Sequence, residues 1–490
     1  MYLKDLLTKL IEYALVHHLI DEDQIKQSED KLGEMFLVKN FVATQSQFHI
    51  DYTHMMKELI DIAYRNKQFQ PDSIDERDAY EAKIIDAVMP SPERVRTVFK
   101  QLYKVNPGRA TDYLYRLSVD VNYIKKNRLK ENISWNYPGK YGHVQMTINL
   151  AKPEKDPKDI ARALLEPTII DINIPKCVIC KENEQNYYNA RMNLRMAPVM
   201  LGHELWYFQY SPYQYYNEHA IILHEEHRPM KIWDKTFEYL FDFVDQFPTY
   251  FIGSNADLPI VGGSILNHDH FQAGKHHFPI EEAVTIKTYT WQDIIKVEHI
   301  KWPLSTVRLS STSREKLSEL ASKFLHQWKS YACQELNIVP FTEQTPHNTI
   351  TPIVRKNHDT YVLDIVFRNN NTNDQYPDGI FHPHQDVHHI KKENIGLIEA
   401  MGLAILPGRL KKELELIKTF LHSHTELPDD LIKHKAWINE LQLVKDVDDQ
   451  LLLEQVSQKF ERVLEDSGVF KLTELGNKKF HLWIEHILQS

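Results

Sequence analysis

The spacing of apolar residues predicts a helical N-terminal region over residues 1–165. Leucine and isoleucine recur every three or four positions over 3–15, with charged residues between them, as in an amphipathic helix. The same spacing returns over 51–64 and 93–102, and prolines separate these stretches. No spacing in this region is typical of a catalytic motif. We therefore expect a helical scaffold or a partner surface here.

The pattern changes to short β-type runs near Pro175. A first lobe, residues 166–290, has one helix over 237–247, and Pro248 ends that helix. A second lobe, 291–406, has strand-like runs followed by a predicted helix over 393–406, and amphipathic helices fill 407–490. Strands are predicted at 206–210, 220–223, 250–253, 268–272, 348–354 and 361–367. The pattern indicates an α+β fold with two sheet lobes between helical N-terminal and C-terminal regions.

Composition narrows the class of protein. The 58 basic and 68 acidic residues give a formal net charge of −10, which argues against a nucleic-acid coat or a protein dedicated to anionic membranes. No apolar run approaches the ~20 residues that cross a bilayer, and the N-terminus lacks the features of a signal peptide. Three cysteines are too few for a disulfide framework. We expect a cytoplasmic protein without nucleic-acid or membrane partners.

The segment His268-Asp269-His270-Phe271-Gln272 carries the strongest chemical signal. As a strand, it places His268, His270 and Gln272 on one face. Gly262, Gly263 and Ser264 lie just upstream and can present backbone N–H groups to an anion. A neutral imidazole is a good nucleophile towards phosphorus, so this pattern suits phosphate chemistry. Half-buried or metal-binding histidines are the alternative.

Cys177-Val178-Ile179-Cys180 forms a C-x-x-C motif. It is half of a zinc site, a redox pair or a chance pattern. Zinc needs two further ligands, and because no second C-x-x-C exists, these should be histidines. A site that uses His227 and His268 would join three segments and leave His270 unligated, so the zinc would be structural. The histidine candidates in this lobe are His219, His224, His227 and His268.

Several segments together resemble one family, the bacterial class II galactose-1-phosphate uridylyltransferases. The similarity covers the middle and C-terminal parts of the chain closely. The segments that carry it are YSPY (210–213), NEH (217–219), EHRPMK (226–231), IGSNADLPIVGGS (252–264), HDHFQ (268–272), FHPH (381–384) and VHHIKKENIG (387–396).

The resemblance implies a histidine-triad-like fold duplicated within the chain. It implies two small-molecule partners, a UDP-hexose and a hexose 1-phosphate, and a homodimer. It implies uridylyl transfer between UDP-glucose and galactose 1-phosphate by double displacement. His270 would be the nucleophile, and Gln272 would steady the transferred phosphoryl group. The phosphate-binding turn would use Gly263 and Ser264, with Asn255 towards the nucleotide.

The resemblance also implies further ligands. The class I branch of the family binds zinc through a C-x-x-C pair and two histidines, which correspond best to Cys177, Cys180, His227 and His268. The ligands of a second metal of class I cannot be placed here, because the nearest strand reads Asp364-Ile365-Val366 without H-x-H, although His382 and His384 could bind an ion of their own. The remaining expected substrate contacts are Asn189, Arg191 and Asn193 for the nucleotide and Lys392, Glu393 and Asn394 for the hexose.

Two alternatives stay open. A nucleotide hydrolase or dinucleotide phosphorylase of the same superfamily would share the motif, although such hydrolases usually have histidine where Gln272 stands. A zinc-stabilised protein that binds nucleotides without turnover is the other alternative.

Overall fold

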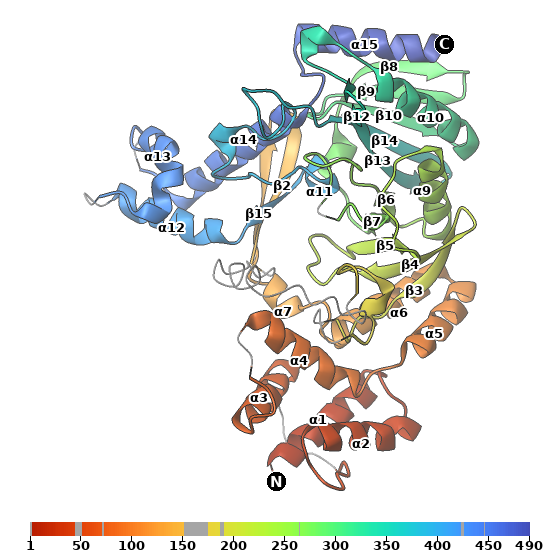
Figure 1. Cartoon of the computed structure of the whole chain (residues 1–490), viewed down its shortest axis with the longest axis vertical. Coiled ribbons are helices and arrows are strands. Elements are labelled where there is room, and N and C mark those ends of the chain that lie inside the picture. The colour runs from red at the N-terminus through yellow and green to blue at the C-terminus, as the bar shows by residue number, and fades with distance from the viewer. Residues whose placement is uncertain are drawn as a thin grey trace.

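The structure is a computed structural model, and it describes residues 2–44, 51–70, 73–150, 175–186, 191–263, 265–422, 426–444 and 446–490. Seven helices make up the N-terminal region up to residue 129 and lie together at one end of the molecule (Figure 1). They are α1 (Tyr2–Val16), α2 (Ile25–Met35), α3 (Tyr52–Arg65), α4 (Ile74–Asp86), α5 (Pro92–Val105), α6 (Pro107–Asp120) and α7 (Lys126–Leu129). Their boundaries follow ordinary capping rules: Asp51, Ser73 and Ser91 each accept a hydrogen bond from a first-turn N–H.

A ten-stranded sheet runs through the centre of the molecule in the order β3-β4-β5-β7-β6-β13-β14-β10-β9-β8 (Figure 1). Every neighbouring pair is antiparallel. This confirms the α+β class and the antiparallel sheet. The strands are β3 (Ala197–Leu201), β4 (Glu204–Tyr210), β5 (Ala220–His224), β6 (Phe251–Gly253), β7 (His270–Gly274), β8 (Thr285–Trp291), β9 (Ile295–Ile300), β10 (Thr306–Ser311), β13 (Asn348–Asn357) and β14 (Thr360–Asn369).

The two halves of the sheet repeat one arrangement. In the first half, three strands precede helix α9 (Asp234–Gln246) and two follow it, giving the order β3-β4-β5-β7-β6. In the second half, three strands precede α10 (Arg314–Ser330) and two longer strands follow it, giving β8-β9-β10-β14-β13. The short hairpin β11 (Phe341–Thr342) and β12 (Thr345–Pro346) precedes β13. The halves join where β6 pairs with β13.

The two faces of the sheet have different covers. Helices α9 and α10 pack on one face, against β3, β6, β10, β13 and β14. Phe271 and Ala273 of β7 belong to the hydrophobic core on that side. His270 and Gln272 alternate with them and therefore project from the opposite face, which we call the site face. In Figure 1 the site face looks towards α11 and the C-terminal helices.

Part of the predicted secondary structure was wrong. The expected helix over 393–406 is the four-residue α11 (Leu397–Ala400) followed by strand β15 (Leu403–Pro407). Gly402 between them has a φ of +98°, which a helix does not allow. Within the predicted helical N-terminal region, β1 (Ile133–Gly139) and β2 (Gly142–Asn149) form a hairpin, and β15 joins β2 in parallel.

Four helices make up the C-terminal region. They are α12 (Arg409–Leu421), α13 (Lys435–Leu441), α14 (Asp449–Ser467) and α15 (Glu474–Gln489), and the last packs against α10 at the β8 end of the sheet (Figure 1). Among the described residues, no helix is both long and apolar enough to cross a membrane.

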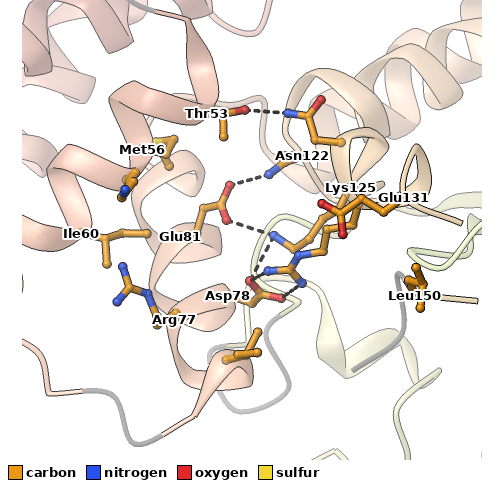
Figure 2. Close-up of a pocket in the computed structure, with 14 residues that line it drawn as sticks. Thr53, Met56, Ile60, Arg77, Asp78, Glu81, Asn122, Lys125, Glu131 and Leu150 are labelled. Atoms are coloured by element: carbon orange, nitrogen blue, oxygen red, sulfur yellow. Dashed lines mark hydrogen bonds and ion pairs between the residues drawn. The ribbon is translucent and has the colours of Figure 1, made fainter. Parts of the chain in front are cut away.

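A pocket of about 500 Å³ lies in the N-terminal region, lined by residues of α3, α4 and the segment around α7 (Figure 2). Four of its charged groups are paired with one another. Asp78 accepts two hydrogen bonds of 2.7 Å from Arg128, and Glu81 lies 3.0 Å from the Nζ of Lys125. None of the predicted site residues lines this pocket, so these ion pairs hold the helices together.

Candidate active site and metal centre

The four predicted metal ligands come together. The ligand atoms of Cys177, Cys180, His227 and His268 all lie within 4.8 Å of one another. Cys177 Sγ is 3.3 Å from Cys180 Sγ and 3.3 Å from His268 Nδ1, and Cys180 Sγ is 3.1 Å from His227 Nδ1. Ligands of one tetrahedral zinc ion are separated by roughly 3.3–3.8 Å, so the donor set fits such an ion. In the part of the chain that the structure describes, this is the one cluster of its kind.

Neighbouring hydrogen bonds orient these ligands. The side-chain amide of Asn183 donates to the carbonyl oxygens of Cys177 and Cys180, which fixes the C-x-x-C turn. His268 donates from Nε2 to the carbonyl oxygen of His224 at 2.9 Å, so its Nδ1 is free to bind a metal. The three segments predicted to share one ion are therefore joined.

His268 does not lie on the strand as predicted, because β7 begins at His270. His268 and Asp269 form a short segment before β7, and the neighbouring turn that carries His227 holds this segment in place. His224 donates its N–H to the carbonyl of Asp269, and Asp269 donates its N–H to the carbonyl of Arg228. The Arg228 guanidinium also lies 3.1 Å from the Asp269 carboxylate. Metal ligands and motif strand thus form one connected unit.

His270 is 5% exposed and projects from the site face. Its Nδ1 donates to the carbonyl oxygen of His268 at 2.7 Å, which leaves the lone pair on Nε2. No hydrogen bond to Nε2 occurs among the described residues. Burial lowers the pKa of His270, so the ring is neutral near pH 7. This geometry presents a neutral nucleophilic nitrogen.

Gln272 lies two residues further along β7. Register places it opposite Gly253, which in turn is opposite Ile353 of β13. Leu397 packs over Gly253, because a Cβ there would lie 2.9 Å from Leu397 Cδ1. The Oε1 of Gln272 is buried without a hydrogen-bond partner. This amide is therefore free to bind a ligand on the site face.

The glycine turn packs tightly on Asn255. A Cβ at Gly263 would lie 2.7 Å from Asn255 Nδ2, and one at Gly262 would lie 2.4 Å from the carbonyl oxygen of Ala256. Neither position has room for a side chain, so the close packing of this turn requires glycine at both. Asn255 is itself buried, and its Oδ1 accepts the N–H of Leu397 at 2.8 Å. Ser264 lies outside the described residues.

Of the three residues predicted at the hexose, Asn394 contacts this turn. Its Nδ2 donates to the carbonyl oxygen of Gly262 at 3.3 Å, and its Oδ1 lies 3.4 Å from His382 Nε2. Lys392 and Glu393 are exposed. The buried lysine of this segment is the neighbouring Lys391, which forms a 3.0 Å ion pair with Glu399.

The predicted nucleotide residues before β3 face the N-terminal region. Arg191 donates to the hydroxyl of Tyr123, and Asn193 donates to the carbonyl oxygen of Val121 at 2.9 Å. Both side chains are buried in these contacts. Their contact with the nucleotide stays a prediction, and Asn189 lies outside the described residues.

The absent H-x-H of the second half is replaced by an ion network. Asp364 of β14 is fully buried, and Arg308 and Arg355 donate to its carboxylate at 2.6 Å and 2.7 Å. Burial acts to raise the pKa of Asp364, but the charges of Arg355 and Arg308 outweigh burial and hold the pKa below its ordinary value. This part of the second half is therefore a salt-bridge network.

Sequence reasoning did not select three polar residues as site residues. His219 is 3% exposed and both of its ring nitrogens lack partners; its ring lies 4.5 Å from that of Tyr216. Thr351 and Arg368 also have buried, unpartnered polar atoms and project from the site face. With Gln272, they make this face unusually rich in open hydrogen-bonding positions, which a bound ligand or water completes. For Arg368, the available signal was its charge, the second of its strand after that of Asp364, within a strand rich in apolar residues.

Comparison with known proteins gives one family. The family model described as "Galactose-1-phosphate uridyl transferase, N-terminal domain" matches residues 18–229, and the one for the C-terminal domain matches residues 242–437. The galactose-1-phosphate uridylyltransferase of Clostridium acetobutylicum is 45% identical, with 98% of each chain covered. Those of Caldanaerobacter subterraneus (44% identical, 97% and 96% covered) and Fusobacterium nucleatum (43% identical, 99% and 99% covered) are similar throughout. The chain therefore belongs to the galactose-1-phosphate uridylyltransferase family.

Proposed function

We propose that the protein transfers a uridylyl group from UDP-glucose to galactose 1-phosphate, giving glucose 1-phosphate and UDP-galactose, through a uridylyl-His270 intermediate. Family membership supports the overall reaction. One observation carries the mechanism: the Nδ1 of His270 is bonded to the His268 carbonyl, and this leaves Nε2 as a nucleophile on a buried face.

In the first step, His270 Nε2 attacks the α-phosphorus of UDP-glucose. A P–N bond forms, the bond from the α-phosphorus to the bridging oxygen breaks, and glucose 1-phosphate leaves with the electron pair. Galactose 1-phosphate then attacks the uridylyl-histidine and restores the neutral imidazole. The leaving group is a phosphate, so no strong general acid is needed. This agrees with an amide at position 272, since Gln272 can hydrogen-bond phosphoryl oxygens without titrating.

Zinc is our proposal for the ion in the Cys177, Cys180, His227 and His268 cluster, because two thiolates and two imidazoles favour it. The ion supplies a rigid cross-link between three segments and takes no part in the chemistry at phosphorus. His268 positions the nucleophile through its carbonyl oxygen, while its ring is a ligand. The zinc is thus structural.

Two assays test the proposal. The first incubates the protein with UDP-glucose and labelled glucose 1-phosphate, and the second with UDP-glucose and galactose 1-phosphate. Label should exchange into UDP-glucose, and galactose 1-phosphate should become UDP-galactose. Steady release of glucose 1-phosphate from UDP-glucose alone would instead indicate the hydrolase. Binding of UDP-glucose without any exchange would indicate the nucleotide-binding protein without turnover.

The proposal has two further parts. The family resemblance supports a homodimer, which light scattering at micromolar concentration tests. The use of only three cysteines supports a cytoplasmic location.

A further inference from the structure

Arg368 of β14 is 1% exposed and has no hydrogen-bond partner within the described residues for its Nε and Nη1 atoms. The other buried cationic side chains of this region each have a carboxylate partner. Arg308 and Arg355 both donate to Asp364, and Lys391 is paired with Glu399. A carboxylate thus neutralises each of these cations directly, whereas the Arg368 guanidinium has no such hydrogen-bonded carboxylate among the described residues and keeps the donors of Nε and Nη1 unused.

Such an arrangement is costly without a ligand. Burial lowers the pKa of Arg368 to about 10, although the charge of Glu399 acts in the opposite direction. The guanidinium nevertheless stays protonated near pH 7. A buried, charged donor without a partner is strongly unfavourable, so an anion that enters the site would satisfy both its charge and its fork of N–H groups.

Register places Arg368 on the site face. Gln272, Gly253, Ile353 and Asp364 stand opposite one another across four strands, and Arg368 follows Asp364 by four residues on β14. Strand side chains alternate, so Arg368 projects from the same face as His270. β7 and β14 are three spacings of ~4.8 Å apart, and Arg368 lies two residues (about 7 Å) beyond the row of His270, so their Cα atoms are about 16 Å apart, which two facing side chains and a bridging phosphate group can span.

A second unpartnered donor lies beside it. Thr351 of β13 pairs with Val366, so Thr351 and Arg368 are diagonal neighbours, with Cα atoms about 7–8 Å apart. The Thr351 hydroxyl is buried and unpartnered. A hydroxyl and a guanidinium at this separation on one face can both donate to a single phosphate group.

We propose that Arg368, assisted by Thr351, binds the phosphate group of hexose 1-phosphate, which is also the β-phosphate of the nucleotide sugar. This inference rests on the proposed function. In the second half-reaction, the bound phosphate dianion attacks through an oxygen; a P–O bond forms, the P–N bond to His270 breaks, and its electron pair returns to the neutral imidazole. No proton has to move.

The test compares Arg368→Met, Arg368→Lys and Thr351→Val with the wild type. Arg368→Met should raise the KM for galactose 1-phosphate on the order of 10- to 100-fold. This is the loss of affinity expected when charge-assisted hydrogen bonds to a buried phosphate are removed. It should weaken the binding of UDP-glucose by a similar factor. The affinity for UMP, measured by calorimetry, should stay unchanged, because UMP lacks the second phosphate. Arg368→Lys should recover part of the loss, and Thr351→Val should cost several-fold.

Stability provides an independent readout. Removing an unpaired buried charge should leave the melting temperature of Arg368→Met unchanged or raised. Arg314→Met, which removes an arginine of α10 paired with Asp242 and Asp245, is the matched control and should not change the KM. An unchanged KM in Arg368→Met overturns the inference. A lower melting temperature, together with a loss of UMP affinity equal to the loss for galactose 1-phosphate, also overturns it, because this result indicates a structural role for Arg368. Absence of exchange in the wild type would instead refute the proposed function.

Discussion

The Nδ1 of His270 lies 2.7 Å from the carbonyl oxygen of His268. One residue therefore does two things: the His268 ring belongs to the metal-ligand cluster, and its backbone fixes the tautomer of the nucleophile. The metal cluster and the proposed chemistry are joined by a single hydrogen bond. Changes at the two histidines should nevertheless have different consequences.

His270→Asn should abolish covalent labelling. With labelled UDP-glucose and no acceptor, the wild type should retain up to one uridylyl group per site, in an acid-labile, base-stable phosphoramidate. The variant should retain none and lose exchange by at least about a thousandfold, because the nucleophile is missing. Nucleotide affinity measured by calorimetry should persist. Near wild-type exchange in the variant would refute the covalent mechanism.

Cys177→Ser should lower zinc content and the melting temperature together. The serine hydroxyl is a poor zinc ligand, and binding of a structural ion contributes directly to folding free energy. Mass spectrometry of metal content and thermal unfolding measure the two effects. Partial exchange activity should survive wherever the protein folds. Full zinc with unchanged melting would contradict the assigned ligand set.

Asp364→Asn should destabilise the fold by about 3–5 kcal/mol, because it leaves Arg308 buried without its carboxylate partner and leaves Arg355 with Glu281 alone. Chemical unfolding of both proteins measures the difference. Asp30→Asn, which removes an exposed partner of Lys26, is the matched control and should cost less than about 1 kcal/mol. Equal effects of the two substitutions would show that the network contributes little.

His219→Phe should reduce the acid sensitivity of the fold. Burial lowers the pKa of His219 to about 3 from an ordinary value of 6.5. Below pH 6.5 the unfolded chain therefore binds a proton that the folded protein excludes, and stability is lost as the pH falls. Between pH 6.5 and 5.0 the wild type should lose roughly 1.5–2 kcal/mol more than the variant. Parallel stability curves for the two proteins over this range would contradict the prediction.

The sequence predicted much of the framework because its signals are local. Short β-type runs rich in aromatic and branched apolar residues predicted the strands around 206–210 and 220–223, and Pro248 marked the end of α9. The metal cluster was predictable because the chemistry of a C-x-x-C pair requires further ligands, and few histidines in the lobe could serve. Periodicity failed over 393–406, where a short apolar run fits helix and strand equally well and parallel pairing with β2 decides.

By itself the sequence determined the α+β class, a strand at His270 and Gln272, the cluster of two cysteines and two histidines, and the family. Only the tertiary structure decided that β6 pairs with β13, because this pairing joins segments about a hundred residues apart. The same long-range register places Arg368 of the second half on the face that carries His270 of the first. Whether a buried charge is paired depends on which distant side chains pack around it, and no local pattern of residues records that.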